Sequence, residues 1–390
     1  MPTPIEATLS AQSDVPAGEH VPAPSAPTDP TRLTYFRGRV ALAAILRALG
    51  VRRDDDVLIQ AFTCMALPEA VMSLGARPKY VDVSAGTPNM DPEDLRRKID
   101  QSARAVVVQH TFGLPAEISR LSAVAGERDI PLIEDCAHTI ASRVDGQRVG
   151  SFGVAAFYSY EASKPVFVGV GGSAIINDPD LADAVTSDYS NYREPSAIVQ
   201  AQLATMFLAH RVAYRPSTYW KVRALFRALS ATGLIRGNYN EVADEKGPAA
   251  DFSRRMGRFQ AGILRRALRE IEENTAHRRR VADQYRLGIS APGITHLSVP
   301  SGVDAVFGRY PLLVENKRSL ISGARRAKVE LADFYATPVH PLEGDGLRSV
   351  HYEPGSCPNA EWMSERIVSL PTGLQVDQRQ VERAVEYLNR

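Results

Sequence analysis

The sequence lacks the marks of several large classes of protein. Its 390 residues include three cysteines, Cys64, Cys136 and Cys357, which are odd in number and far apart. That pattern argues against a disulfide framework and against a metal site, and it predicts reduced thiols in the cytoplasm. No stretch of about 18 apolar residues occurs, so we expect no transmembrane helix and no integral contact with a membrane.

The chain also has almost no net charge. Its 46 Lys and Arg residues nearly balance 45 Asp and Glu residues. This balance gives no global electrostatic reason to expect nucleic acid or an anionic membrane as a partner. The hydrophobic content of 44% and charged content of 23% are typical of a globular protein, and the length suits two domains.

Residues 1–30 differ from the rest because they are rich in Pro, Ala, Ser and Thr and contain no Lys or Arg. A secretory signal needs a basic start followed by an apolar core, and this segment has neither. We predict a disordered tail here.

From residue 36 to residue 177, short apolar runs alternate with amphipathic stretches. The predicted strands are residues 57–60, 79–83, 105–109, 132–134, 155–158 and 174–176, and the predicted helices are residues 40–49, 68–74, 92–99 and 116–128. Such alternation predicts an α/β domain, residues 31–270, in which a mostly parallel sheet carries helices on both faces. Ligands of such sheets bind at the carboxyl ends of the strands.

The rest of the chain has a different pattern. Within residues 195–250, the stretches 200–208 and 219–229 are apolar with interspersed arginines. They predict two packed amphipathic helices, with a subunit interface as one location and a basic surface touching a membrane as the alternative. One long charged helix is expected over residues 259–285. Three apolar runs, 310–314, 336–339 and 367–370, and a helix over 377–388 then indicate a small α+β domain, residues 271–390.

Lys164 is the most informative residue, because it follows a predicted strand and pairs with an acid earlier in the chain. Asp135 directly follows the predicted strand over residues 132–134, and Ser159 stands five residues before the lysine. This is the arrangement that a pyridoxal 5'-phosphate (PLP) enzyme needs. The lysine amine forms a Schiff base with the cofactor aldehyde, and the acid keeps the pyridinium nitrogen protonated. The serine hydroxyl can reach the phosphate.

Each of these residues also has a simpler interpretation. Asp135 alone could cap a helix, and Lys164 alone could lie on the surface, although the apolar, glycine-rich residues 166–172 that follow are unusual for a surface. Gly38 and the residues after it open a helix whose N–H groups could bind a phosphate or form a plain junction. His138 could hydrogen-bond the cofactor ring oxygen or Asp135, or be a satisfied core histidine.

Taken together, the motifs resemble a known family, the DegT/StrS-type, PLP-dependent sugar aminotransferases of fold-type I. The resemblance extends from residue 36 to the C-terminus. It rests on the order and spacing of residues 36–42 (FRGRVAL), 61–64 (AFTC), 75–83 (GARPKYVDV), 89–92 (NMDP), 109–116 (QHTFGLPA), 133–138 (IEDCAH), 149–153 (VGSFG), the lysine segment, 255–256 and 259–261, and 369–371 (SLP).

The resemblance implies a role for several residues. Lys164 would form the Schiff base and shuttle the proton between the Cα and C4′ positions. Asp135 would hold the pyridinium, and His138 would lie near the ring. Ser159 and the N–H groups of Gly38 and Arg39 would bind the phosphate.

Four positions depart from the family pattern. Val170 stands in the glycine-rich run where the family often has an acidic residue. Arg39 stands where the family usually has a threonine, although a guanidinium can also bind phosphate. Cys64 stands where an aromatic side chain often stacks on the ring. Ser253 is the best match to the asparagine that the family often supplies to the phosphate of the neighbouring subunit.

The implied reaction is transfer of an amino group, from glutamate, to a keto group on a nucleotide-linked sugar or a related cyclic ketone. A homodimer with a shared site is implied as well. One alternative is a PLP-dependent lyase or dehydratase, but the dehydratases of the family replace the lysine with histidine, and this chain has Lys164. The departures at Arg39, Cys64 and Ser253 leave a degenerate binding or regulatory protein as the other alternative.

Overall fold

The computed structural model describes residues 30–162, 164–214, 218–231 and 250–390. The predicted tail, residues 1–30, lies outside the described residues apart from Pro30.

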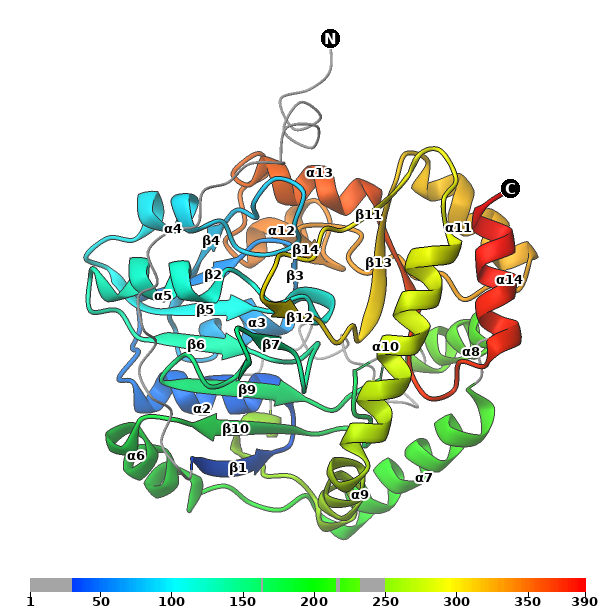
Figure 1. The fold of residues 1–390 in the computed structure, drawn as a ribbon. Helices are drawn as coiled ribbons and strands as arrows, with labels where there is room; N and C mark the ends of the chain where they lie inside the picture. The colour runs from blue at the N-terminus through cyan, green and yellow to red at the C-terminus, as the bar shows by residue number, and fades with distance from the viewer. Residues whose placement is uncertain (1–29, 163, 215–217, 232–249) are drawn as a thin grey trace.

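A seven-stranded sheet forms the centre of the molecule (Figure 1). Its strand order is β1-β10-β9-β6-β5-β2-β4, and every pairing from β9 to β4 is parallel, whereas β10 runs antiparallel to both of its neighbours. The strands are β1 (Thr31–Tyr35), β2 (Asp56–Gln60), β4 (Arg77–Val81), β5 (Ala103–Gln109), β6 (Leu132–Asp135), β9 (Ala155–Ser159) and β10 (Gly172–Ile176). The predicted mostly parallel sheet is therefore confirmed. Strand β1 was not predicted, because this short edge strand is only partly buried and has no continuous apolar run.

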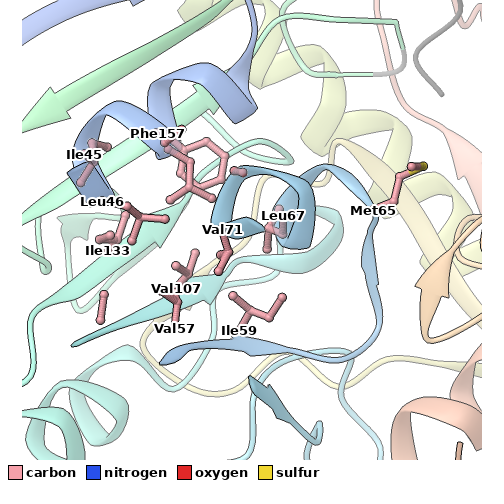
Figure 2. Packing of buried hydrophobic residues seen from close by; sticks show 14 of the residues in the cluster. Ile45, Leu46, Val57, Ile59, Met65, Leu67, Val71, Val107, Ile133 and Phe157 are labelled. Carbon is pink, nitrogen blue, oxygen red and sulfur yellow. The ribbon is translucent and has the colours of Figure 1, made fainter. Parts of the chain in front are cut away.

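Helices cover both faces of this sheet, as predicted. Side chains of β2, β5, β6 and β9 at alternate positions pack against α2 and α3, as Figure 2 shows for Ile45, Val71, Ile59, Val107 and Ile133. The residues between them on β2, β5 and β6 face α4 and α5, whereas those on β9 pack with Met256 and Leu264. The helices and short turns of this part are α2 (Gly38–Ala48), α3 (Ala66–Met72), α4 (Pro92–Lys98), η1 (Thr111–Gly113), α5 (Ile118–Gly126) and α6 (Pro179–Tyr189).

This alternation decides where the two acids at the end of β6 point. Successive side chains of a strand lie on opposite faces of the sheet. Asp135 therefore shares the face of Ile133, which packs with α2, whereas Glu134 faces the other side.

The helical segment after the sheet is partly as predicted. Helices α7 (Ala197–Ala213) and α8 (Tyr219–Ala231) confirm the two expected helices, and residues 215–217 and 232–249 of that segment lie outside the described residues. The turn η2 (Ala250–Ser253) follows. Among the described residues, no helix is both long and apolar enough to cross a membrane.

The prediction of one helix over residues 259–285 is wrong. The chain forms two helices, α9 (Arg258–Arg269) and α10 (Ile271–Gly288), which meet at Glu270 (φ −94°, ψ 12°). The break has a packing reason. Leu264 of α9 packs with a cluster under the main sheet, whereas Val281 and Tyr285 of α10 pack with the small C-terminal sheet.

The C-terminal part is an α+β unit around an antiparallel sheet of order β11-β13-β15. Its elements are β11 (Ile294–His296), β13 (Arg309–Val314), α11 (Lys317–Arg326), α12 (Asp345–Ser349), α13 (Pro358–Arg366), β15 (Ile367–Pro371) and α14 (Gln378–Leu388).

Two short pairings join this unit to the larger one. Strand β14 (Val339–His340) pairs with β3 (Thr63–Cys64), and β12 (Val303–Asp304) pairs with β7 (Arg143–Val144), which also pairs with β8 (Gln147–Arg148). The expected strand over residues 336–339 thus overlaps the observed one at Val339 alone. The domain division between residues 270 and 271 stays a prediction.

Candidate active site

Asp135 lies at the carboxyl end of β6, almost completely buried. Among the described residues, its carboxylate accepts one hydrogen bond, from the Ala137 N–H at 2.8 Å. Burial raises the pKa of Asp135 to about 6, against the lowering effects of this hydrogen bond and of the Lys164 charge. A carboxylate so placed needs a positively charged partner in order to stay ionised.

Lys164 lies half-buried in the loop between β9 and β10. The Val168 N–H donates to the Tyr160 carbonyl and the Tyr160 N–H to the Gly171 carbonyl, both at 2.9 Å, so the loop is closed by its own backbone. Burial has the largest effect on the pKa values of Asp135, Cys64 and His138, and the charge of Lys164 acts on all three in the lowering direction. The fold therefore brings the amine close to the acid, the thiol and the imidazole that the sequence singled out.

A close backbone approach marks the start of α2. A Cβ on Gly38 would lie 3.0 Å from the Ser159 Cβ, and one on Gly172 would lie 2.4 Å from the Gly38 nitrogen. Arg37, the N-cap residue, makes no side-chain cap to the helix. The first N–H groups of α2 thus lie beside the Ser159 side chain, and this is a suitable cradle for a phosphate.

Arg39 is buried in the first turn of α2, where its guanidinium forms an ion pair with Glu69 of α3. Burial raises the pKa of Glu69, although the charges of Arg39 and Arg37 lower it. Arg39 also lies close enough to Cys64 to lower the pKa of the thiol. Its side chain thus belongs to the site, but its main described partner is a carboxylate.

Cys64 is half-buried in β3, and burial raises the pKa of its thiol, while Lys164 lowers it. The thiol is therefore neutral near pH 7. It lies where the resemblance places a stacking side chain, but a thiol offers no aromatic face.

His138 is held by two hydrogen bonds, and neither involves Asp135. Its Nδ1 accepts the Phe112 N–H at 3.1 Å, so the Nε2–H of the neutral ring donates to the Tyr335 hydroxyl at 3.0 Å. The ring also stacks with those two aromatic side chains. Burial, together with the Lys164 charge, lowers the pKa of His138 well below its usual value. It is a satisfied, neutral histidine at the edge of the site.

Ser253 is exposed in η2, where its carbonyl accepts the Arg193 N–H. Its expected role toward a neighbouring subunit stays a prediction.

Two charged residues that the sequence analysis did not single out also shape the site. Arg37, 2% exposed, donates to Glu161 at 2.8 Å and to Asp251 at 3.4 Å. Glu161 stands three residues before Lys164. A signal was available, because charged residues inside apolar segments require partners when they are buried.

The neighbouring acid, Glu134, has a separate network. With His110 and Cys136 it forms a buried group whose ligand-type atoms lie within 4.8 Å of one another. Both carboxylate oxygens are already engaged, by the His110 ring at 3.1 Å and by three backbone N–H groups, those of Gly150, Phe152 and Gly153. The His110 Nδ1 accepts the Ala116 N–H. Hydrogen bonding inside the protein accounts for this group.

Comparison with known proteins assigns the chain to a family. The model of the DegT/DnrJ/EryC1/StrS aminotransferase family matches residues 33–389. The chain belongs to this family. The resemblance inferred from the sequence is therefore confirmed, and the protein is an enzyme of the aminotransferase class.

The relatives are distant but cover most of the chain. A UDP-N-acetyl-3-dehydro-α-D-glucosamine 3-aminotransferase from Acidithiobacillus ferrooxidans is 26% identical over 355 residues, 90% of this chain and 82% of the relative. A UDP-2-acetamido-2-deoxy-3-oxo-D-glucuronate aminotransferase from Pseudomonas aeruginosa is 26% identical over 340 residues, 87% of this chain and 80% of the relative. The crystal structure of the aminotransferase TlmJ from Streptoalloteichus hindustanus superimposes with a TM-score of 0.71 at 23% identity, covering 92% of this chain and 84% of that one. This likeness confirms the fold.

Proposed function

We propose that the protein is a PLP-dependent aminotransferase that moves an amino group from glutamate to the keto group of a nucleotide-linked sugar or a related cyclic ketone. The observation that carries the proposal is the pairing of a half-buried amine, Lys164, with a buried acid that has one hydrogen-bond donor, Asp135. The protonated ring nitrogen of PLP would supply the missing partner of that acid.

The other end of the site fits the cofactor as well. The start of α2 and the Ser159 side chain make a cradle that a Cβ on Gly38 would fill, and a phosphate fits such a helix terminus. Arg39 would add a positive charge nearby.

When bound, PLP supplies the aldehyde that carries the amino group and the ring that accepts the electrons of the broken bond. The residues of the chain would do the rest. Lys164 would hold the cofactor at its aldehyde carbon and then move a proton from the donor Cα to the C4′ position. Asp135 would keep the ring nitrogen protonated, while Ser159 and the N–H groups of Gly38 and Arg39 would hold the phosphate. His138 and Cys64 would border the ring.

The acceptor class rests on the relatives. Their names describe aminotransferases for UDP-linked sugars and for 2-deoxy-scyllo-inosose, a dTDP-linked sugar transaminase and a GDP-perosamine synthase. We infer a keto sugar or a cyclic ketone for this chain too. We also infer a homodimer in which Ser253 reaches the phosphate of the neighbouring subunit. The three free thiols favour a reducing, cytoplasmic location.

The test is a half-reaction. Glutamate added to the PLP-loaded protein should bleach the visible absorbance of the cofactor and release 2-oxoglutarate, and a matching keto sugar nucleotide should restore the absorbance. Lys164→Ala should abolish both changes. Lys79→Ala, which removes a surface pair with Asp100, is the matched control and should behave as wild type.

Full turnover and retained absorbance in Lys164→Ala would refute the assignment of the lysine. Turnover without any amino donor would favour elimination. A purified protein that does not bind PLP would favour a degenerate binding protein.

A further inference from the structure

Arg278 is a charged residue buried beside the loop that carries Lys164. It stands in the first half of α10 and is 5% exposed. Its Nη2 donates to the carbonyl of Pro165, the residue directly after Lys164, at 3.0 Å. The same carbonyl also accepts a hydrogen bond of 3.3 Å from the Asn274 side chain, one helical turn earlier in α10. Two side chains of one helix therefore fix the peptide that follows the lysine.

The remaining donors of Arg278 bind the small C-terminal unit. Nη1 donates to the Gly308 carbonyl and to the Thr372 hydroxyl, both at 2.9 Å, and Nε donates to the Asn274 amide oxygen at 2.7 Å. Gly308 directly precedes β13, and Thr372 directly follows β15. One guanidinium thus joins the lysine loop to the ends of two strands of the other sheet.

The packing around these contacts leaves little room for movement. A Cβ on Gly308 would lie 2.6 Å from the His138 carbonyl oxygen and 3.3 Å from the Pro165 Cγ. The small unit therefore touches the segments after both Asp135 and Lys164 at one point. Arg278 makes its hydrogen bonds at that point.

The chemistry of the partners is unusual for a buried arginine. All four acceptors are neutral oxygens, and within the described residues no carboxylate pairs with this guanidinium. Burial, together with the nearby positive charge of Arg309, lowers the pKa of Arg278 to about 10, so the group is still cationic near pH 7. Burying an unpaired cation is costly, and a neutral side chain would fill the space at lower cost. The fixed fork of five donors explains its presence, since lysine or glutamine could bind fewer of these oxygens.

The loop has a second arginine at its other end. Arg37 binds Glu161, three residues before Lys164, through a buried ion pair of 2.8 Å. One arginine therefore holds a side chain before the lysine, and the other holds the backbone just after it.

We propose that Arg278 is a positioning residue for Lys164: its hydrogen bonds to the Pro165 carbonyl, Gly308 and Thr372 set the direction of the lysine side chain relative to Asp135. The inference rests on the proposed function, in which Lys164 moves the proton. Since misplacement of a reacting group by about 1 Å can lower a rate about a hundredfold, a loosened loop should slow proton transfer while leaving substrate binding intact.

The test compares the PLP-loaded variants Arg278→Gln and Arg278→Lys with Arg279→Gln. Arg279 is the next residue of the same helix and forms a partly exposed pair with Asp304, so it is the matched control. In the half-reaction with glutamate, both Arg278 variants should be slower by about ten- to a hundredfold, with the apparent glutamate affinity changed by less than about twofold. Arg278→Lys should not rescue the rate, because an ammonium carries three donors on a single nitrogen and cannot reach all four acceptors.

Two further readouts separate positioning from a purely structural role. The primary isotope effect with α-deuterated glutamate should increase in the Arg278 variants, and the visible circular dichroism of the bound cofactor should change. Thermal unfolding and cofactor loading are measured alongside. A variant that loses stability but keeps the wild-type rate, isotope effect and dichroism per loaded site would overturn the proposal.

If both Arg278 variants fail to fold, Asn274→Ala decides, because it removes the second donor to the Pro165 carbonyl and leaves the guanidinium in place. We expect it to slow the half-reaction by about threefold and to shift the dichroism, and an unchanged rate and spectrum would overturn the proposal. A wild-type protein inert toward glutamate would instead contradict the proposed function itself.

Discussion

Glu134 and Asp135 are neighbours on β6 and are both buried, yet the protein treats them differently. Glu134 accepts three backbone N–H groups from residues 150–153 and one hydrogen bond from the His110 ring, so both of its oxygens are saturated. Asp135, on the opposite face, has one donor among the described residues, and burial raises its pKa. Burial alone therefore does not distinguish the two acids, whereas the supply of hydrogen-bond donors does.

The histidines near these acids show the limit of that rule. His110 and His138 each have both ring nitrogens engaged, the first by Ala116 and Glu134 and the second by Phe112 and Tyr335. Hydrogen bonding does not separate them, but His138 lies near Lys164, whose charge adds to burial in lowering the pKa of His138. The number of hydrogen-bond donors therefore distinguishes the two acids, whereas hydrogen bonding does not distinguish the two histidines.

The largest expected effect comes from Asp135→Asn. An amide cannot keep the ring nitrogen protonated, so the half-reaction with glutamate should slow by about a thousandfold. The measurement is stopped-flow absorbance of the PLP-loaded variant. Glu134→Gln is the control on the other face and should stay within about threefold of wild type per loaded site. Equal losses in the two variants would contradict the distinction.

The second effect concerns stability, and here the substitution of Glu134 should cost more than the substitution of Asp135. In Glu134→Gln the new NH2 group faces buried donors, so the free energy of unfolding should fall by about 3 kcal/mol. Asp135→Asn removes a charge that is poorly satisfied without cofactor, so the apoprotein should lose no stability near pH 7. Urea unfolding of the two apoproteins measures both values. A destabilised Asp135→Asn apoprotein would show that its carboxylate is structural after all.

Much of the fold could be predicted because the sequence pattern is local. Buried parallel strands are apolar throughout, and the residues at the ends of β5, β6 and β9 stand out against them. The predictions that failed concern structure that depends on contacts between distant parts of the chain. The break at Glu270 depends on α9 and α10 packing on different clusters, and the short strand β14 depends on its pairing with β3, far away in the chain.

The site residues likewise divide into those that the local sequence predicts and those that depend on distant partners. Lys164 and Asp135 follow from strand ends and spacing, and the fold brings them together. The partners of His138 and Arg39 did not follow, since Tyr335 and Glu69 reach them from other elements. Arg278 carries no sequence signal, because it stands in a run of three arginines on α10, and three of its four acceptors come from segments far away in the chain.

A smaller effect is the pH dependence that Asp135 gives the apoprotein. Its pKa is about 6 in the folded state and about 3.9 when unfolded, so the folded state binds more protons between these values. This contribution to stability, about 3 kcal/mol in full, is present well below pH 4 and is lost as pH rises through 6, and about 2 kcal/mol of it is lost between pH 4 and pH 7.5. The check is the difference in unfolding free energy between wild type and Asp135→Asn from pH 4 to pH 7.5. A difference that does not change with pH would mean that folding does not raise the pKa of Asp135.

The smallest effect tests whether His138 belongs to the site or to the core. Tyr335→Phe removes the partner of its Nε2, and Tyr310→Phe removes the partner of His296 Nδ1 in a matched pair at 2.7 Å, away from Lys164. Each variant should lose about 1 kcal/mol of stability, because a buried donor or acceptor is left unpaired. Only Tyr335→Phe should also slow the half-reaction, by about threefold, since the freed imidazole can turn away from the cofactor ring. Thermal unfolding and stopped-flow absorbance of both variants measure these values. If the two variants have the wild-type rate, His138 supports the loop around Phe112 and takes no part in the chemistry.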